Sequence, residues 1–296
     1  MMEVPYSGEK IAKVGDIAIA YDTFGDPSFP PMLLIMGLGG QMIRWDDLFC
    51  KMLAAQGRWV IRFDNRDVGL STKFDDLGLP DLGSLLQRKR VDVPYKLIDM
   101  AGDAVGLLDV LGVKAADVVG VSMGGMIAQT IAIHFPDRVR TLTSIMSTTG
   151  NPSLPQAKPE VMSLLFTPPV SNRDDYVKNS LISERILHGP QFQLDEEYAR
   201  SFAERAYDRC YHPQGFSRQL GAILASGSRH QELEKVKIPT LVIHGDSDPL
   251  VPVEGGKDTA KCIPNSKLLI IEGMGHSIPI QVASKILSAI KEHTTL

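Results

Sequence analysis

One serine in the chain has the spacing of a catalytic nucleophile. Ser122 lies in the run Gly120-Val121-Ser122-Met123-Gly124, which reads G-x-S-x-G. In this pattern a serine sits on a sharp turn from a strand to a helix, with its hydroxyl free to attack a carbonyl. Residues 117–121 (D-V-V-G-V) suit a buried strand, and residues 126–135 carry apolar side chains at helical spacing. These flanks favour a nucleophilic serine over a chance match.

A serine nucleophile needs a base, and one of the seven histidines has a suitable position. Residues 267–271 read as a strand, and Gly273-Met274-Gly275-His276 follows almost directly. In a parallel sheet the carboxyl ends of the strands share one edge, where functional side chains collect. The two glycines allow the loop to return over Ser122. We therefore predict that His276 is the base.

The imidazole in turn needs a carboxylate that fixes its tautomer. Asp246 and Asp248 both follow the strand-like run 238–244, between the serine and the histidine in the chain. Asp246 comes directly after this strand and could instead cap the turn with its carboxylate. Asp248 lies deeper in the loop, where it can reach across to His276. We predict Asp248 as the acid and keep Asp246 as the alternative.

Attack on a carbonyl also produces a negative oxygen, which needs two donors that are already in place. One is expected to be the backbone N–H of Met123, the residue after the nucleophile. The other is expected from the loop Gly37-Leu38-Gly39-Gly40 after the apolar run 32–36, and Leu38 is the best candidate. Only main-chain groups are required, so the same glycines could also serve simply to turn the chain.

Strand-like and helix-like runs alternate along most of the chain, which is typical of a parallel sheet covered by helices on both faces. After a hairpin at 10–14 and 17–24, we expect strands at 32–36, 59–63, 117–121, 140–145, 238–244 and 267–271, with helices at 44–56, 96–111, 126–135, 254–261 and 279–292. The alternation breaks at a proline-rich stretch, which leads to three helix-like runs at 174–187, 195–211 and 214–225. We predict an α/β core domain (1–150 and 233–296) with a helical cap inserted into it (151–232).

The composition argues against several other classes of protein. The chain of 296 residues carries 31 Lys and Arg against 35 Asp and Glu, a net charge of −4, which disfavours a nucleic-acid partner. No run approaches the roughly 20 apolar residues of a membrane span, and Met1–Lys10 lacks the apolar centre of a signal peptide. We therefore expect a cytoplasmic protein. Cys50, Cys210 and Cys262 are widely spaced and indicate neither a disulfide framework nor a metal site.

Together these motifs resemble those of the α/β-hydrolase fold superfamily over nearly the whole chain. The order serine, aspartate, histidine is the family's order, and the matching runs are 37–40, 120–124, 244–248 and 275–276. Residues 64–71 look like the family's structural aspartate–arginine–glycine–serine loop, and residues 36–41 resemble capped esterases of the aclacinomycin methylesterase type. The resemblance implies a mostly parallel eight-stranded sheet, flanked by helices and carrying a helical cap. One departure is Met36, since many relatives have a histidine there that anchors the oxyanion loop.

The resemblance implies a serine hydrolase that cleaves carboxylic esters of small to medium apolar substrates through an acyl-enzyme, without a metal or cofactor. Ser122 disfavours the haloalkane dehalogenases and epoxide hydrolases of the family, which have aspartate at the nucleophile position. Lactonases, carbon–carbon bond hydrolases and cofactor-free haloperoxidases keep the serine and stay as alternatives. A hydrolase-like receptor that only binds its ligand is a further one.

The substrate is expected between the sheet edge and the cap. Several of the 12 methionines fall near predicted strand ends, and methionine adapts to irregular apolar ligands, although core packing is the more ordinary explanation. We predict substrate contacts from Gln41, Met146, Phe166 and Met274, while Gln41 could instead simply start the following helix. The expected partner is a small-molecule ester or lactone, and the expected assembly is a monomer or homodimer.

Overall fold

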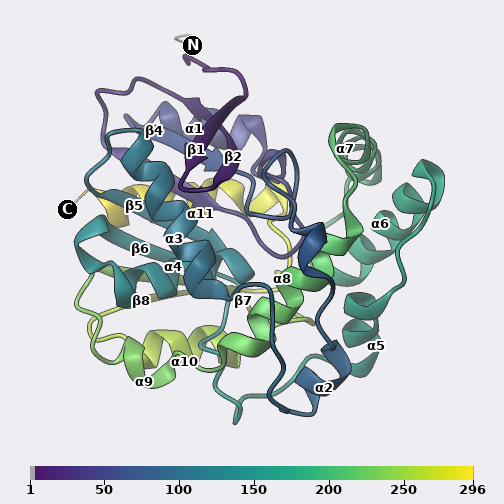
Figure 1. Ribbon diagram of the computed structural model, residues 1–296. Helices are drawn as coiled ribbons and strands as arrows, with labels where there is room; N and C mark the ends of the chain where they lie inside the picture. Colours follow the sequence, from purple (N-terminus) through teal and green to yellow (C-terminus); the bar gives the residue numbers. More distant parts are fainter. Residues whose placement is uncertain (1–3, 296) are drawn as a thin grey trace.

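The computed structural model describes residues 4–295. The expectation that Met1–Lys10 contains no signal peptide falls partly on residues 1–3, which lie outside the described residues, as does Leu296. One sheet runs through the molecule in the order β1-β2-β4-β3-β5-β6-β7-β8 (Figure 1). Its strands are β1 (Lys10–Val14), β2 (Ile17–Phe24), β3 (Pro31–Ile35), β4 (Trp59–Phe63), β5 (Ala116–Val121), β6 (Val139–Ile145), β7 (Thr240–Gly245) and β8 (Lys267–Ile271). Strand β2 pairs antiparallel with β1 and β4, and every other pairing is parallel. The predicted sheet of eight mostly parallel strands is confirmed.

Helices cover both faces of the sheet because successive strand residues point to opposite sides. In β3, Leu33 and Ile35 belong to one apolar cluster and Met32 and Leu34 to the other. The first cluster lies under α3 (Leu97–Val110) and α4 (Met123–His134) and reaches α9 (His230–Leu233) and α10 (Glu254–Cys262). The second lies under α1 (Asp47–Ala54) and α11 (Ile280–Thr294).

Between β6 and β7 the regular elements of the described chain are all helices. Its helices before α9 are α5 (Pro159–Met162), α6 (Arg173–Leu187), α7 (Glu196–Arg209) and α8 (Pro213–Ser226). Helices α5, α6 and α7 stand to one side of the sheet, whereas α8 crosses in front of it and lies beside α3 (Figure 1). Helices α6 and α7 enclose a small apolar cluster of their own, made of Val177, Leu181, Ala199 and Ala203. By contrast, Ala222 of α8 belongs to the cluster of the sheet.

Several short elements differ from the expectation. The helix expected at 44–56 begins only at Asp47, because the Asp46 side chain accepts a hydrogen bond from the Leu48 amide and caps the first turn. Helix α2 (Leu82–Leu86), α5 and α9 were not expected, because helices of five residues or fewer leave no periodic pattern. Short 3₁₀ turns lie at 42–44, 75–77, 136–138 and 163–166. Across residues 4–295, the structure contains no helix with both the length and the apolar character to cross a membrane.

Candidate active site

Ser122 lies at the turn between β5 and α4, in a backbone conformation that few side chains adopt. Its φ is 54°, and strained positions of this kind cluster at functional sites. A Cβ at residue 120 would overlap the Gly124 carbonyl. Because Gly120 has no Cβ, the strand and the helix can approach each other closely enough to form this turn. The Ser122 amide donates to the Ile145 carbonyl (2.9 Å), and Ser147 Oγ donates to the Ser122 carbonyl (2.8 Å).

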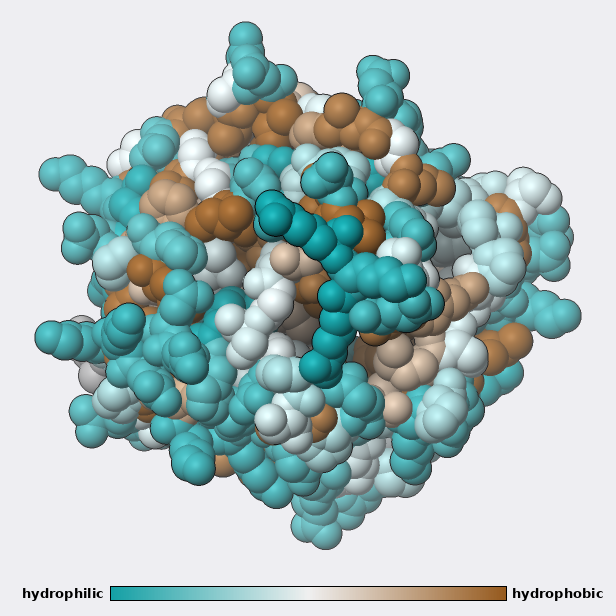
Figure 2. Space-filling view, turned by 60° about the horizontal axis from the view of Figure 1, so that its bottom comes forward, coloured by the Kyte–Doolittle hydropathy of each residue, from teal (hydrophilic) through white to brown (hydrophobic). Residues whose placement is uncertain are grey.

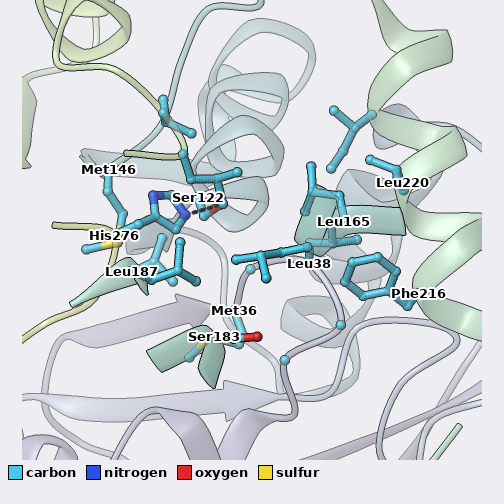
Figure 3. A pocket seen from close by; sticks show the side chains of 18 of the residues that line it. Met36, Leu38, Ser122, Met146, Leu165, Ser183, Leu187, Phe216, Leu220 and His276 are labelled. Atoms are coloured by element: carbon cyan, nitrogen blue, oxygen red, sulfur yellow. Dashed lines mark hydrogen bonds between the residues drawn. The ribbon is translucent and has the colours of Figure 1, made fainter. Parts of the chain in front are cut away.

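Two hydrogen bonds join Ser122, His276 and Asp248 in a line. His276 Nε2 lies 2.9 Å from Ser122 Oγ (Figure 3). On the other side of the ring, His276 Nδ1 lies 2.7 Å from Asp248 Oδ2. A carboxylate can only accept, so Nδ1 carries the proton and Nε2 accepts from the serine hydroxyl. This is the tautomer in which the imidazole can act as a base toward the serine.

The Asp248 carboxylate is buried and held on both oxygens. Its Oδ1 accepts from the Leu250 amide (2.9 Å) and the Val251 amide (2.8 Å), while Oδ2 faces His276. Burial alone would raise the pKa of Asp248, but the charge of His276 and the hydrogen bonds from His244 and His276 outweigh it and hold that pKa well below its usual range. The carboxylate therefore stays ionised beside the imidazole.

Asp246 has different contacts from Asp248. Its Oδ1 accepts from the Gly273 amide (2.7 Å) and from Ser247 Oγ (3.0 Å). It thus ties the loop after β7 to the loop that carries His276, while the bond to His276 itself comes from Asp248. The turn-capping alternative considered for Asp246 matches these contacts.

His244, at the end of β7, is a neighbour of the acid that the sequence analysis passed over as a strand residue. Its Nε2 lies 2.8 Å from the Val251 carbonyl and 3.4 Å from Asp248 Oδ2, the same oxygen that faces His276. The spacing of His244 and Asp248, four residues apart across the end of a strand, was the available signal.

The two expected oxyanion donors belong to two segments that meet near Ser122. Met123 is the first residue of α4, so its N–H has no acceptor within the helix. The loop that contains Leu38 approaches from β3, and a Cβ on neighbouring Gly37 would lie 3.2 Å from Ser122 Cβ. Within residues 4–295, no hydrogen bond uses the Leu38 amide. Both N–H groups are thus available near the serine.

Met36 stands where many relatives have a histidine that anchors the oxyanion loop. In this chain, side chains from elements distant in sequence hold the loop. Asn65 Nδ2 donates to the Met36 carbonyl (2.9 Å), and the Gly39 amide donates to Gln219 Oε1 of α8 (2.8 Å). Gln219 is completely buried, and its Nε2 donates to the Arg66 carbonyl (2.8 Å). Support for the loop therefore comes from the neighbouring β4 loop and from α8, which the sequence analysis did not identify.

The end of α6 rests directly on the loop of His276. The His276 amide donates to the Leu187 carbonyl (2.6 Å), and the Gly275 amide donates to the His188 carbonyl (3.2 Å). Gly189 has a φ of 95°, and a Cβ there would overlap the Gly275 amide. The backbone of the inserted helices thus takes part in placing the histidine.

Ser122 opens into a cavity of about 2020 Å³ between the sheet edge and the inserted helices. Figure 3 shows the apolar wall of this cavity near the serine. Met146 and Leu187 lie beside His276, and the wall continues with Leu38, Leu165, Phe216 and Leu220. The basic run 88–90 lines the same cavity. Figure 2 shows a hollow in this part of the surface, where hydrophilic side chains lie across apolar ones.

Of the four predicted substrate contacts, the structure brings three to the cavity. Met146, Phe166 and Gln41 line it. The Gln41 amide is already engaged, because Nε2 donates to the Ala206 carbonyl (2.6 Å) and Oε1 accepts from Arg209 (2.7 Å), which ties the oxyanion loop to α7. Met274 does not line the cavity: it is completely buried in the core, because the loop turns it away from the serine and against Gly245.

Comparison with known proteins identifies the family. The model of the alpha/beta hydrolase fold family matches residues 30–281. The chain belongs to this family. Rhodomycin D methylesterase of Streptomyces peucetius is 30% identical, over 94% of the chain and 95% of the relative. Poly(3-hydroxyalkanoate) depolymerase of Ectopseudomonas oleovorans is 30% identical, over 90% of the chain and 84% of the relative.

Solved structures of the alpha/beta hydrolase fold agree with this assignment. The meta-cleavage product hydrolase of Pseudomonas fluorescens IP01 superimposes with a TM-score of 0.77 at 18% identity, over 96% of each chain. At this identity the likeness concerns the fold alone. The sequence relatives support a hydrolase that acts on carboxylic esters.

Proposed function

We propose that this alpha/beta hydrolase is a serine esterase in which Ser122 is the nucleophile, His276 the base and Asp248 the acid. The hydrogen-bonded line from Ser122 Oγ through the imidazole to Asp248 is the observation that carries the proposal. The relatives named above, a methylesterase and a polyester depolymerase, support ester hydrolysis independently.

In the first step, Ser122 Oγ attacks the ester carbonyl while His276 Nε2 takes the hydroxyl proton. The carbonyl oxygen becomes negative and is stabilised by the N–H groups of Met123 and Leu38, which need not reorganise at that moment. Collapse of this intermediate breaks the bond to the alcohol oxygen, and His276 returns the proton to the leaving alcohol. Asp248 stabilises the imidazolium while it exists.

In the second step, His276 takes a proton from water, and the resulting hydroxide attacks the acyl-enzyme carbonyl. The same two N–H groups stabilise the second negative intermediate. Its collapse breaks the bond to Ser122 Oγ, which regains its proton from His276, and the carboxylic acid leaves. The chain's own residues perform every proton transfer in this sequence.

We further propose that residues 151–232 form a cap that closes the substrate cavity against the core. The separate apolar cluster between α6 and α7 and the position of these helices beside the sheet support this division. A cavity of about 2020 Å³ exceeds the roughly 300–1,000 Å³ of common ligand pockets. It leaves room for apolar acyl groups larger than the small to medium substrates expected from the sequence.

The proposal is tested by the hydrolysis of p-nitrophenyl esters from acetate to laurate, together with a panel of lactones. We expect turnover that disappears in Ser122→Ala, with the highest kcat/KM toward the longer acyl chains. The chain-length optimum then reports the length of the cavity that the substrate uses. Absence of turnover on every ester and lactone, with folded protein, would reject the esterase and favour carbon–carbon bond hydrolysis or ligand binding alone.

A further inference from the structure

Three potential metal ligands meet between α9 and α10, outside the residues assigned to catalysis. His230 opens α9, and Asp258 and Cys262 lie four residues apart in α10, where side chains share one face of a helix. His230 Nδ1 lies 3.0 Å from Asp258 Oδ2 and 3.1 Å from Cys262 Sγ. The three ligand atoms all lie within 4.8 Å of one another. One nitrogen, one oxygen and one sulfur thus face a common point.

Hydrogen bonds to His230 Nδ1 cannot satisfy all the polar groups that approach this nitrogen. Asp258 Oδ2, Cys262 Sγ and, at 3.4 Å, Asn151 Nδ2 all approach the same ring nitrogen of His230. A ring nitrogen either donates one hydrogen bond or accepts one, so it cannot satisfy a carboxylate, a thiol and an amide together. A cation held between the nitrogen, the carboxylate and the sulfur would satisfy all three of those atoms.

The surroundings resemble those of metal-bound histidines. The other ring nitrogen, Nε2, lies 3.9 Å from Glu234 Oε1, one helical turn further along the chain. Thr149 Oγ1 donates to Asp258 Oδ2 (2.5 Å) and orients the carboxylate. A histidine that binds a metal usually directs its second nitrogen toward a carboxylate or another acceptor, and ligating carboxylates are in turn hydrogen-bonded. The hydrogen-bonded carboxylate is present, whereas Glu234 lies near Nε2 at a distance too long for a hydrogen bond.

We propose that His230, Asp258 and Cys262 form a Zn²⁺ site, with a water molecule as the fourth ligand. Imidazole and thiolate select zinc over the oxygen-binding cations Mg²⁺ and Ca²⁺, and zinc favours four tetrahedral ligands. The His230 side chain is 31% exposed and that of Asp258 is 11% exposed, so the ion can enter from solvent.

Binding has a chemical consequence at the sulfur. Zinc binds the thiolate, and each binding event therefore releases the thiol proton to solvent. Affinity for zinc falls as the pH is lowered.

The position of the ligands gives the site a structural role. Helix α9 spans the boundary between the proposed cap (151–232) and the core, whereas α10 packs on β7 and β8. An ion at this point would fasten the chain that returns from the inserted helices to the core. The readouts are accordingly metal binding and thermal stability, which do not depend on the proposed esterase activity.

The experiment titrates metal-free protein with Zn²⁺ and, separately, with Co²⁺ as a spectroscopic probe. We expect one Zn²⁺ per chain, a higher Tm with Zn²⁺ but not with Mg²⁺, and a thiolate-to-cobalt charge-transfer band in the near ultraviolet. Cys262→Ser should abolish that band and weaken zinc binding at least tenfold. His230→Asn and Asp258→Asn should also weaken binding, and Cys210→Ser, which removes a thiol elsewhere, should bind like the wild type.

Two results would overturn the proposal. One is a wild-type protein that binds no stoichiometric zinc, and the other is equal zinc binding by wild type and Cys262→Ser. Circular dichroism without metal identifies any variant that fails to fold. In that case His230→Asn, which changes a partly exposed residue, decides the question.

Discussion

At the scale of single residues, two neighbouring aspartates have the same chemistry but different contacts. Asp248 directs one oxygen to His276 and the other to two backbone amides, whereas Asp246 binds the Gly273 amide. The direction of each carboxylate, rather than its type, sets what it can do. Asp248→Asn and Asp246→Asn should therefore have different effects on turnover.

Asp248→Asn is expected to lower kcat by about 10⁴-fold, the loss seen when the acid of such a triad becomes an amide. The amides of Leu250 and Val251 require an acceptor, so the asparagine oxygen takes that place and its NH₂ group faces His276. The imidazole proton then moves to Nε2, which can no longer accept from Ser122. Rates on a p-nitrophenyl ester, at unchanged thermal stability, measure this effect.

Asp246→Asn is the matched control for that variant. Its oxygen can still accept from the Gly273 amide, so we expect kcat within a few-fold of the wild type. A larger loss in Asp246→Asn than in Asp248→Asn would contradict the assignment of the acid.

At the scale of secondary-structure elements, the end of α6 is hydrogen-bonded to the loop that carries His276. Two carbonyls of its last turn accept from the amides of Gly275 and His276, and Gly189 fits only because it lacks a Cβ. The inserted helices therefore do more than cover the cavity. They share hydrogen bonds with the segment that must place the imidazole within reach of Ser122.

Gly189→Ala is expected to lower kcat at least tenfold, because the new Cβ displaces the backbone beside His276. Gly112→Ala is its control: Gly112 also has a positive φ, 70°, but nothing lies within 4 Å of its Cβ position. Both variants carry a backbone cost of about 1–2 kcal/mol. Gly189→Ala adds the clash with the Gly275 amide, so its Tm should fall further than that of Gly112→Ala, and only Gly189→Ala should lose turnover. Equal kcat in the two variants would show that α6 does not position the histidine.

The elements also explain how far sequence reasoning could go. Ser122, Asp248 and His276 could be predicted to meet, because each follows a strand-like run and parallel strands end at one edge. The contact between Gln219 and the oxyanion loop could not, because 180 residues separate the two partners and no local pattern records which helix packs on which loop. Met274 was misplaced for a related reason: the direction of a side chain in a glycine-rich turn depends on the fold around it.

The same limit applies to Cys262. In the sequence, the wide spacing of Cys262 from the other cysteines indicated no metal site. The absence of a metal remains a prediction, which the zinc titration tests. The proposed ligands become visible only when α9 and α10 are brought together. Spacing of four residues between Asp258 and Cys262 was present in the sequence, but without the histidine it is unremarkable.

At the scale of the whole molecule, a buried ion pair joins the core to α8. Asp67 follows β4. Its carboxylate accepts from Nε and Nη2 of Arg218, each at 2.8 Å, and from Tyr95 Oη at 2.6 Å. Both charged side chains are almost fully buried. Burial acts to raise the pKa of Asp67, but the hydrogen bonds from Arg218, Tyr95 and the Phe74 amide outweigh it and lower that pKa.

This lowered pKa predicts how stability depends on pH. An aspartate titrates near 3.9 in the unfolded chain, so the contribution of Asp67 is complete well above that pH and is lost as the pH falls through its lower folded value. Asp67→Asn should destabilise the protein by about 1.5–3 kcal/mol at pH 7, the value of hydrogen bonds to a charged group, because buried Arg218 then keeps only the exposed carboxylate of Asp75 as a charge partner. Asparagine tolerates the positive φ of 69° at this position, so backbone strain adds little.

The measurement is urea unfolding of wild type and Asp67→Asn at several pH values between 7 and 3. We expect the difference in unfolding free energy to narrow as the pH falls below about 4, since protonation of Asp67 in the unfolded chain then reduces the stability that the ionised carboxylate gives the wild type. Asp208→Asn, which breaks an exposed pair with Arg173, should differ little from wild type at any pH because water screens that pair. A difference for Asp67→Asn that stays constant over this range would mean that packing, and not the charge, makes this tie between α8 and the core.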